Sequence, residues 1–299
     1  MVTSNKRKYF KILNKDSPPC WVLKVILVLQ PTLAGEVLAQ QVLQENQIWA
    51  SSVVRDRGQP VIPTYEGWYT NQDGTHSLCY GYFNLNMKET LEIPHGSLNR
   101  LEGVDDGVFT ELQTPTHFDP MPPRYRRKFC VFTVNVPADF SQQDRVVWHL
   151  SSAGQTFQAQ GHINPYFFLD EPETRGRLKK APTVTISDGD EPGRGRNGVY
   201  SRNEVKAVVG SPVELSLYRI ESEVDRVWVG WSKYSGPGEV VFSNAEGMIE
   251  GNTIVSAETE ATFSEPGEYV IYAQAIENIA DFEFFCCHTN AYLRVNVSQ

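Results

Sequence analysis

The stretch 212–220 reads PVELSLYRI, and apolar and polar side chains alternate along it. On an extended chain Val213, Leu215 and Leu217 fall on one face of the strand. Glu214, Ser216 and Tyr218 fall on the other face. This period of two is typical of a β-strand with one buried face. The stretch therefore predicts a strand that covers a hydrophobic core.

The same alternation recurs on both sides of this strand. Residues 224–231 read VDRVWVGW and place Val227, Val229 and Trp231 on one face. Seven short strands with frequent turns predict an immunoglobulin-like (Ig-like) β-sandwich. Besides the two stretches above, the expected strands are 183–187, 240–242, 261–263, 267–275 and 291–297.

Within this half, the run ATFSEPGEYVI at residues 261–271 resembles the later half of polycystic-kidney-disease-type (PKD) and related bacterial Ig-like domains. In those domains a Pro-Gly turn leads into a strand that contains tyrosine, and Tyr269 stands where a tyrosine corner falls. The resemblance covers residues 181–299. It matches the usual third-strand tryptophan with Trp228 or Trp231 but lacks the Gly-Asp segment that often follows. It implies an adhesive or spacer module.

Two positions of this resemblance bear on the core. Ile271 stands at the place of the second core cysteine of Ig domains, and Leu215 or Leu217 at the place of the first. We therefore expect an apolar core without an inter-sheet disulfide.

The first half of the chain also consists of strand-like runs separated by turns. Residues 65–70 and 77–84 flank the turn signal NQDG and predict a hairpin, and residues 145–151 and 155–163 predict another around Ala153-Gly154. No run here has the 3.6-residue period of a helix. The predicted fold class is therefore all-β, with two Ig-like β-sandwich domains in tandem. The expected division is 61–169 and 183–299, with a charged linker at 170–182.

This first half resembles, more distantly, the N-terminal part of exported bacterial proteins without an assigned activity, which implies export and little else. The segments that carry the resemblance are DG at 73–74, GYFN at 81–84, IP at 93–94, NR at 99–100, PTHF at 115–118 and VP at 136–137.

The first 39 residues have the layout of a secretory signal peptide. Basic residues precede the short apolar run 25–33, and small or apolar residues precede Gln40. A retained membrane anchor is the alternative, but the run is shorter than the roughly 20 residues that span a bilayer. We expect cleavage, a polar arm at 40–60 and no membrane span in the mature chain. The predicted location is the periplasm or the cell surface.

The mature chain keeps an even number of cysteines, as suits an oxidising compartment. Cys79 and Cys130 fall in two predicted strands and form either a disulfide or two buried thiols. Cys286 and Cys287 are adjacent, so a vicinal disulfide, pairing of one of them elsewhere and free thiols all stay open.

Two segments resemble metal sites. Asp188, Asp190 and Glu191 offer oxygen ligands for calcium, although their spacing does not match an EF-hand and a solvated acidic turn is the alternative. Cys286 and Cys287 with His288 form the second segment, but adjacent strand residues point to opposite faces, which disfavours a zinc site. Copper is the alternative, because thiolate and imidazole both suit it. Calcium is the one cofactor that we allow for; no other is expected.

The residues that follow the acidic segment, GRGRNG at 193–198, match the glycine pattern of dinucleotide-binding loops. Such a loop needs a strand directly before it and a helix directly after it. Neither flank fits, so we interpret this segment, the GxGxxG loop, as a flexible loop.

The first predicted hairpin is rich in aromatic residues. If one of its faces is open to solvent, these rings can stack on a sugar or bind a protein partner; packing in the core is the alternative. The candidates are Tyr65, Trp68, Tyr69, Tyr80 and Tyr82.

The function predicted from these features is non-catalytic. A net charge of −9 disfavours nucleic-acid binding. The sequence contains no GxSxG nucleophile elbow, no HExxH helix and no Walker loop. We expect a scaffold or interaction subunit that binds protein partners in the cell envelope. The alternatives are a carbohydrate-binding protein, for which a glycan is the ligand, and a copper-binding redox accessory protein.

Overall fold

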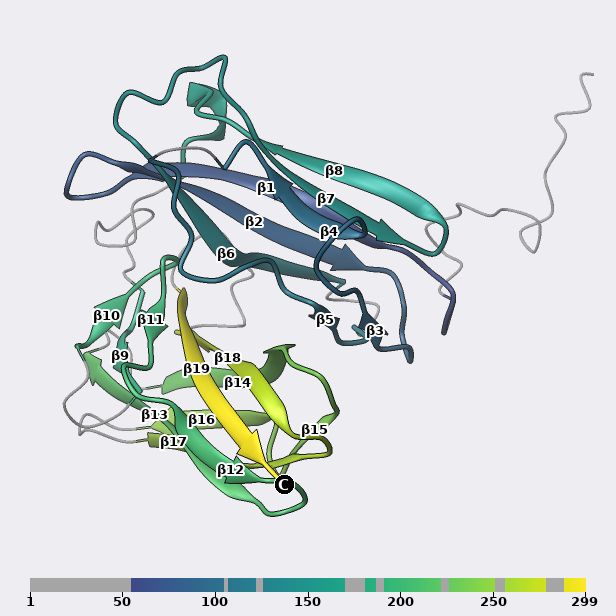
Figure 1. The fold of residues 1–299 in the computed structure, drawn as a ribbon. Helices are drawn as coiled ribbons and strands as arrows, with labels where there is room; N and C mark the ends of the chain where they lie inside the picture. The colour runs from purple at the N-terminus through teal and green to yellow at the C-terminus, as the bar shows by residue number, and fades with distance from the viewer. Residues whose placement is uncertain are drawn as a thin grey trace, which may run out of the picture. The chain divides into compact units, whose positions relative to one another are not determined.

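Strands make up nearly all of the regular structure in the computed structural model (Figure 1). The structure describes residues 55–104, 107–121, 126–169, 181–186, 191–221, 226–250, 256–277 and 288–299. Within them a short 3₁₀ helix, η2 (Pro165–Phe167), is the one helical element. No helix among these residues has the length and apolarity to cross a bilayer. The fold is all-β, with two Ig-like β-sandwiches in tandem, as the alternation predicts.

The N-terminal sandwich has two three-stranded sheets and a small strand pair. One sheet has the order β1-β2-β6 and the other β4-β7-β8, while β3 pairs with β5. The strands are β1 (Val61–Thr70), β2 (His76–Asn84), β3 (Leu91–Glu92), β4 (Asn99–Glu102), β5 (His117–Phe118), β6 (Arg127–Val136), β7 (Val146–Ser152) and β8 (Gln155–Gly161).

Both predicted hairpins are confirmed by antiparallel pairing of β1 with β2 and of β7 with β8. The first turn closes because the amide of Thr75 donates to the Asp73 carboxylate at 3.0 Å. In the second turn Ala153 and Gly154 both have positive φ, of 49° and 73°. That combination gives a two-residue turn whose twist matches that of the flanking strands.

Stacked aromatic rings join the two sheets. Tyr80 of β2 stacks on Phe132 of β6 at 5.2 Å, and Phe132 meets Trp148 of β7 edge-on at 5.0 Å. The indole of Trp148 donates to Asn99 Oδ1 at 2.9 Å, so this buried ring leaves no polar group unpaired.

The C-terminal sandwich is built from two larger sheets. One has the order β10-β9-β13-β17-β15; the other has the order β11-β19-β18-β14-β16, with β12 also pairing with β19. The strands are β9 (Thr183–Thr185), β10 (Gly193–Arg194), β11 (Val199–Tyr200), β12 (Val205–Val208), β13 (Val213–Glu221), β14 (Arg226–Ser235), β15 (Val240–Phe242), β16 (Glu246–Glu250), β17 (Ser256–Phe263), β18 (Gly267–Ile276) and β19 (His288–Ser298).

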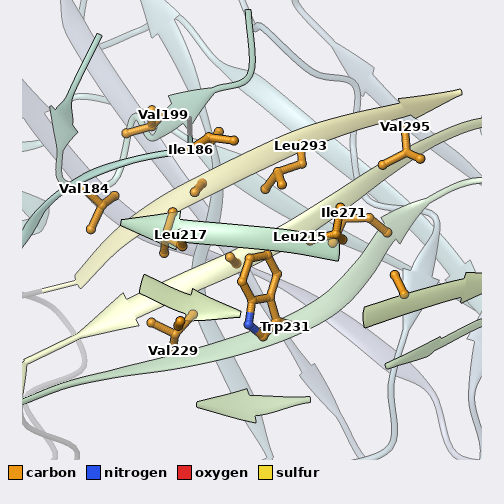
Figure 2. Packing of buried hydrophobic residues seen from close by; sticks show 14 of the residues in the cluster. Val184, Ile186, Val199, Leu215, Leu217, Val229, Trp231, Ile271, Leu293 and Val295 are labelled. Atoms are coloured by element: carbon orange, nitrogen blue, oxygen red, sulfur yellow. The ribbon is translucent and has the colours of Figure 1, made fainter. Parts of the chain in front are cut away.

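The core of this sandwich is apolar, as predicted (Figure 2). Leu215 and Leu217 of β13 face Ile271 of β18, and all three are buried. Val229 and Trp231 of β14 are buried beside them, which confirms the side of the strand that the alternation assigned to the core.

The predicted tyrosine corner is also confirmed. The Tyr269 hydroxyl donates to the Glu265 carbonyl at 2.8 Å and accepts from the Gly238 amide at 3.0 Å. Gly236 lies against the ring with φ of 140°, and a Cβ there would come within 2.2 Å of a ring atom. The corner therefore ties two loops to the start of β18.

Replacing Tyr269 by phenylalanine is expected to lower the free energy of unfolding by about 1–2 kcal/mol, because the Gly238 amide and the Glu265 carbonyl lose their partner. Urea denaturation followed by tryptophan fluorescence measures this change. Tyr166→Phe is the matched control, since its ring is 95% exposed and the lost hydroxyl faces water. An equal effect of the two substitutions would contradict a structural role of the corner.

The two sandwiches contact each other through buried tyrosines. Tyr234 of β14, Tyr272 of β18 and Tyr292 of β19 belong to one apolar cluster with Tyr82 and Phe118 of the N-terminal sandwich. We call this contact the seam. It means that the sandwiches are packed together and not joined by the chain alone. The domain boundaries proposed above stay a prediction, because residues 170–180 lie outside the described residues.

Candidate binding surface

Three consecutive aromatic residues lie open to solvent at the end of the N-terminal sandwich. Tyr166 is 95% exposed, Phe167 44% and Phe168 48%. Large apolar side chains that are exposed together often mark a binding surface. We call Tyr166, Phe167 and Phe168 the aromatic ledge.

The chain before and after the ledge is fixed by hydrogen bonds. The Asn164 side chain accepts from the Tyr166 amide at 3.0 Å and caps η2, and Pro165 favours the helical backbone at its first position. On the far side the Leu169 amide donates to the Trp68 carbonyl at 2.7 Å. The Trp68 indole donates back to the Asn164 carbonyl at 2.8 Å. The ledge is thus fastened to β1 at both ends.

Half-buried rings lie beneath the ledge. Phe168 meets Trp68 edge-on at 5.0 Å, and Phe167 contacts Tyr65 at 5.9 Å and His162 at 4.8 Å. Burial raises the pKa of Tyr65, and burial together with the charge of Arg145 lowers the pKa of His162. Both therefore tend to be neutral, and the ledge rests on an uncharged aromatic base.

The aromatic residues singled out in the sequence divide into two groups. Tyr65 and Trp68 are half-buried and support the ledge. Tyr69, Tyr80 and Tyr82 are at most 4% exposed, so as surface candidates they were wrong and they pack in the interior instead. Tyr80 packs between the two sheets and Tyr82 packs at the seam. Tyr69 lies under the GxGxxG loop. The ledge itself was missed, although PYFF directly after Asn164 is a visible run of three aromatic residues.

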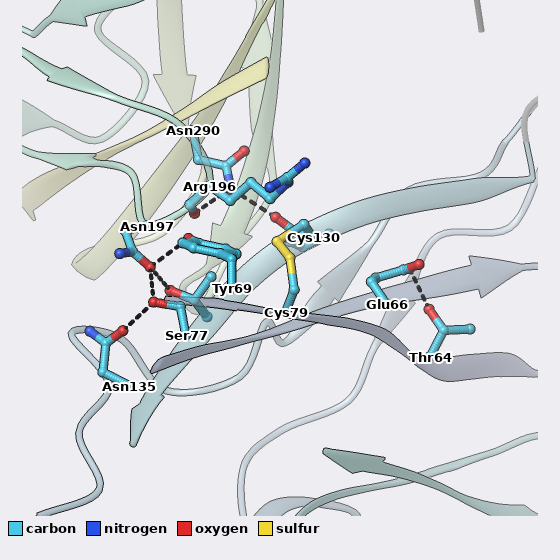
Figure 3. Close-up of a disulfide and its surroundings, with 12 residues drawn as sticks. Thr64, Glu66, Tyr69, Ser77, Cys79, Cys130, Asn135, Arg196, Asn197 and Asn290 are labelled. Carbon is cyan, nitrogen blue, oxygen red and sulfur yellow. Dashed lines mark hydrogen bonds between the residues drawn. A yellow bond between two sulfur atoms is a disulfide. The ribbon is translucent and has the colours of Figure 1, made fainter. Parts of the chain in front are cut away.

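The GxGxxG loop is ordered and inserts into the seam, which corrects its interpretation as a flexible loop. Asn197 Oδ1 accepts from the hydroxyls of Tyr69, Ser77 and Thr133, each at 2.9 Å (Figure 3). Its amide nitrogen donates to Asn71 at 3.0 Å. One side chain of the C-terminal sandwich therefore contacts three strands and one turn of the other.

The neighbouring Arg196 is 2% exposed and lies with its guanidinium 5.5 Å from the Tyr69 ring centre. Burial raises the pKa of Tyr69 to about 12, although the positive charge of Arg196 acts in the opposite direction. The phenol therefore keeps its proton for Asn197. This loop is therefore a structural wedge between the sandwiches.

The disulfide Cys79–Cys130 is confirmed and lies beside this wedge (Figure 3). It joins β2 to β6, which are neighbours in one sheet, so it links strands and not sheets. Cys130 sits where the pairing of β2 with β6 is irregular and has a φ of 44°. Its carbonyl accepts from Asn290 Nδ2 at 2.8 Å across the seam.

Glu66 is a buried carboxylate close to the disulfide (Figure 3). Glu66 accepts from Thr64 at 2.8 Å and pairs with Arg127. Burial raises the pKa of Glu66 in spite of that pairing. Gly81 leaves room for it, since a Cβ at that position would lie 2.4 Å from Glu66 Oε1. These contacts give Glu66 a structural role as the partner of Arg127 in a buried ion pair.

The two predicted metal sites fall mostly outside the described residues. Asp188, Asp190, Cys286 and Cys287 lie there. Glu191 is exposed, with a carboxylate oxygen 3.8 Å from Arg202. Among the residues that the structure does describe, no three His, Cys, Asp or Glu side chains come together to hold an ion. The calcium site stays a prediction.

His288, the third member of the copper set, is buried at the start of β19. Burial, with Arg196 nearby, lowers its pKa to about 3, so the imidazole is neutral. A neutral imidazole is the form that binds metals, but this residue alone makes no site. The copper site also stays a prediction.

Comparisons with known proteins give only distant structural likenesses. No protein-family model and no curated protein matches the chain. Among solved structures, it is similar to the D00-D0 domain of intimin, with 10% identity over 80% of this chain and 100% of that one and a TM-score of 0.27. A PapD-like domain of human CEP192 aligns with 12% identity over 44% of this chain and 94% of that one, at 0.28. Domains 4 and 5 of the S-layer protein SbsC align with 10% identity over 81% and 98%, at 0.25. At these TM-scores the likenesses carry no inference about function.

Proposed function

We propose that this chain is an exported, non-catalytic interaction protein that binds a protein partner of the cell envelope through the aromatic ledge. In this proposal the C-terminal sandwich is a PKD-type spacer and the N-terminal sandwich presents the binding surface. The observation that carries it is the exposure of Tyr166, Phe167 and Phe168 on a backbone that is already fixed.

The chemistry of the ledge favours a protein over a sugar. Aromatic residues are enriched at protein–protein interfaces and often supply most of the binding energy. Two of the three rings are phenylalanines, which offer no hydrogen bond to a sugar hydroxyl. Because the ledge is held at Trp68 and Asn164, binding costs little further conformational entropy.

The disulfide supports an oxidising location. Disulfides such as Cys79–Cys130 persist mainly outside the cytosol. The predicted signal peptide is consistent with that location. The periplasm or the cell surface is therefore the proposed site of action.

Replacing Tyr166 by alanine is expected to weaken binding of the partner at least tenfold, or about 1.4–2 kcal/mol. The stability of the free protein should stay within about 0.5 kcal/mol of wild type, because the ring is 95% exposed. To identify the partner, a photo-crosslinking amino acid is placed at position 166 in the native envelope. Affinity is then measured on the purified pair by calorimetry.

Val241→Ala is the matched control, since Val241 is a 64% exposed apolar residue of the other sandwich. Equal affinity of wild type and Tyr166→Ala would refute the ledge as the binding surface. A glycan array tests the carbohydrate alternative. Retention of a sugar by wild type that Tyr166→Ala abolishes would replace the protein partner with a glycan.

A further inference from the structure

Four ionisable side chains meet at one side of the seam. His117 Nδ1 lies 2.6 Å from Glu92 Oε1, and His117 Nε2 lies 2.8 Å from Asp119 Oδ1. The same Glu92 oxygen lies 2.7 Å from Lys233 Nζ. Glu92, His117 and Asp119 belong to the N-terminal sandwich and Lys233 to β14 of the C-terminal one, so Glu92 bridges the two.

The geometry around His117 requires a protonated ring. A neutral imidazole has one N–H and can donate to one carboxylate only. Both ring nitrogens face carboxylate oxygens at hydrogen-bond distance, so both must carry a proton to donate. Loss of one proton would leave a nitrogen lone pair against a carboxylate and would remove the positive charge that balances Glu92 and Asp119.

Lys233 is held in place and cannot easily move away from Glu92 when His117 loses a proton. It is 4% exposed, and its ammonium group also donates to the carbonyls of Gly238 at 2.6 Å and Gly236 at 3.2 Å. These two bonds fix the ammonium group close to Glu92. A buried ammonium group depends on a nearby carboxylate, since an unpaired charge in the interior is strongly destabilising.

The backbone beside this cluster joins the sandwiches directly. The Thr116 amide donates to the Tyr234 carbonyl at 3.0 Å, and the Tyr234 hydroxyl donates to the Gln113 carbonyl at 2.7 Å. Thr116 is next to His117, and Tyr234 is next to Lys233. A displacement of His117 or of Glu92 therefore distorts the hydrogen bonds between the two sandwiches at the seam.

We propose that His117, Glu92 and Lys233 form a proton-dependent clasp, which holds the two sandwiches together while the His117 ring is charged and loosens the seam when the ring loses its proton. The clasp makes the coupling between the sandwiches a function of pH. It is independent of the aromatic ledge and of what the ledge binds.

The pKa directions of the three groups agree with this geometry. Burial lowers the pKa of His117, but the hydrogen bonds to Asp119 and Glu92 outweigh it and raise the pKa above its ordinary value. For Glu92 and Asp119 burial acts upward, and the contacts with His117 and Lys233 outweigh it and lower both pKa values.

The sign of the pH dependence follows from these directions. A raised His117 pKa stabilises the folded state fully below the ordinary value of about 6.5, and this contribution is lost as the pH rises through the folded-state pKa. The lowered pKa values of Glu92 and Asp119 stabilise the folded state above about pH 4, the ordinary range of carboxylates. This stabilisation is lost on acidification below that range. The clasp is therefore strongest in mildly acid solution and opens on the alkaline side.

Other titratable groups lie near the cluster. Lys128 of β6 lies near Asp119, and burial lowers its pKa while Asp119 and Glu246 act upward. Burial raises the pKa values of the phenols of Tyr82 and Tyr269, and the charges of Asp119 and Glu92 respectively raise them further. His117 is the one of these groups that contacts both Glu92 and Asp119 directly, so the test compares the pH step with the titration of this ring.

The test measures amide hydrogen exchange at the seam and the titration of the histidine in the same full chain. After correction for the intrinsic exchange rate, protection of the Thr116 amide in wild type is expected to fall between pH 6 and pH 9. The fall should be about tenfold for each pKa unit by which the folded-state pKa of His117 exceeds the ordinary pKa of histidine. The midpoint should coincide with the His117 midpoint from the NMR shifts of the ring. In His117→Gln the protection should be low at pH 6 and show no such step.

His149→Gln is the matched control. His149 also lies 2.8 Å from a carboxylate, that of Glu102, but both belong to the N-terminal sandwich. This variant should keep the pH step at Thr116. A wild-type protein without a step, or with a midpoint different from that of His117, overturns the clasp, and so does a step that survives in His117→Gln. The wild-type comparison of midpoints decides the matter even if His117→Gln does not fold.

Discussion

Replacing Asn290 by leucine is expected to lower the free energy of unfolding by about 3–5 kcal/mol. Asn290 is completely buried, and its amide nitrogen donates to the carbonyl of Cys130 at 2.8 Å and of Arg196 at 3.0 Å. Its oxygen accepts from the Tyr272 hydroxyl at 2.8 Å. Leucine has a similar size but leaves all three of these buried groups without a partner. Each such group costs about 1–3 kcal/mol.

Asn296→Leu is the matched control, because Asn296 lies on the same strand with its side chain exposed. It should change stability by at most about 0.5 kcal/mol. Guanidinium denaturation followed by circular dichroism gives both values. If the two leucine variants were equally stable, Asn290 would not be the polar centre of the seam.

The second large effect is expected from loss of the disulfide. The variant Cys79→Ala/Cys130→Ala should be less stable than wild type by about 2–4 kcal/mol, since the bond closes a loop of 51 residues and restricts the unfolded chain. It should also weaken the seam, because Cys130 presents the carbonyl that binds Asn290. The loss in the combined variant with Asn290→Leu should then be smaller than the sum of the separate losses, as residues in direct contact seldom act additively.

The backbone of Cys130 calls for a second variant. At a φ of 44° alanine is as strained as cysteine, whereas glycine is not. Cys79→Ala/Cys130→Gly should therefore lose less stability than the double alanine variant, and the difference measures the strain at this bend. Thermal unfolding with and without reductant checks the cross-link itself. A wild-type protein whose unfolding temperature does not change on reduction would rule out a stabilising disulfide.

Local patterns in the sequence determined the strands and the sides they bury. Leu215, Leu217 and Trp231 lie in the core because alternation fixes the face of a strand wherever the strand lies. Turn chemistry placed both hairpins of the N-terminal sandwich. The tyrosine corner at Tyr269 followed from a short local motif, and the pairing of Cys79 with Cys130 was one of two outcomes left open.

Only the tertiary structure decided how these parts act together. Asn197 and Asn290 are polar residues with no periodic signal, and their partners across the seam are remote in the chain, as Cys130 is from Asn290 at a separation of 160 residues. The clasp also needs Lys233 to reach Glu92 from the other sandwich. The ledge likewise depends on Phe168 lying beside Trp68 of β1. Alternation and turn signals report on neighbours along the chain, whereas a buried hydrogen bond or an exposed ring depends on which distant strands come together. The sandwiches could therefore be predicted from the sequence, whereas the seam, the clasp and the exposure of the ledge could not.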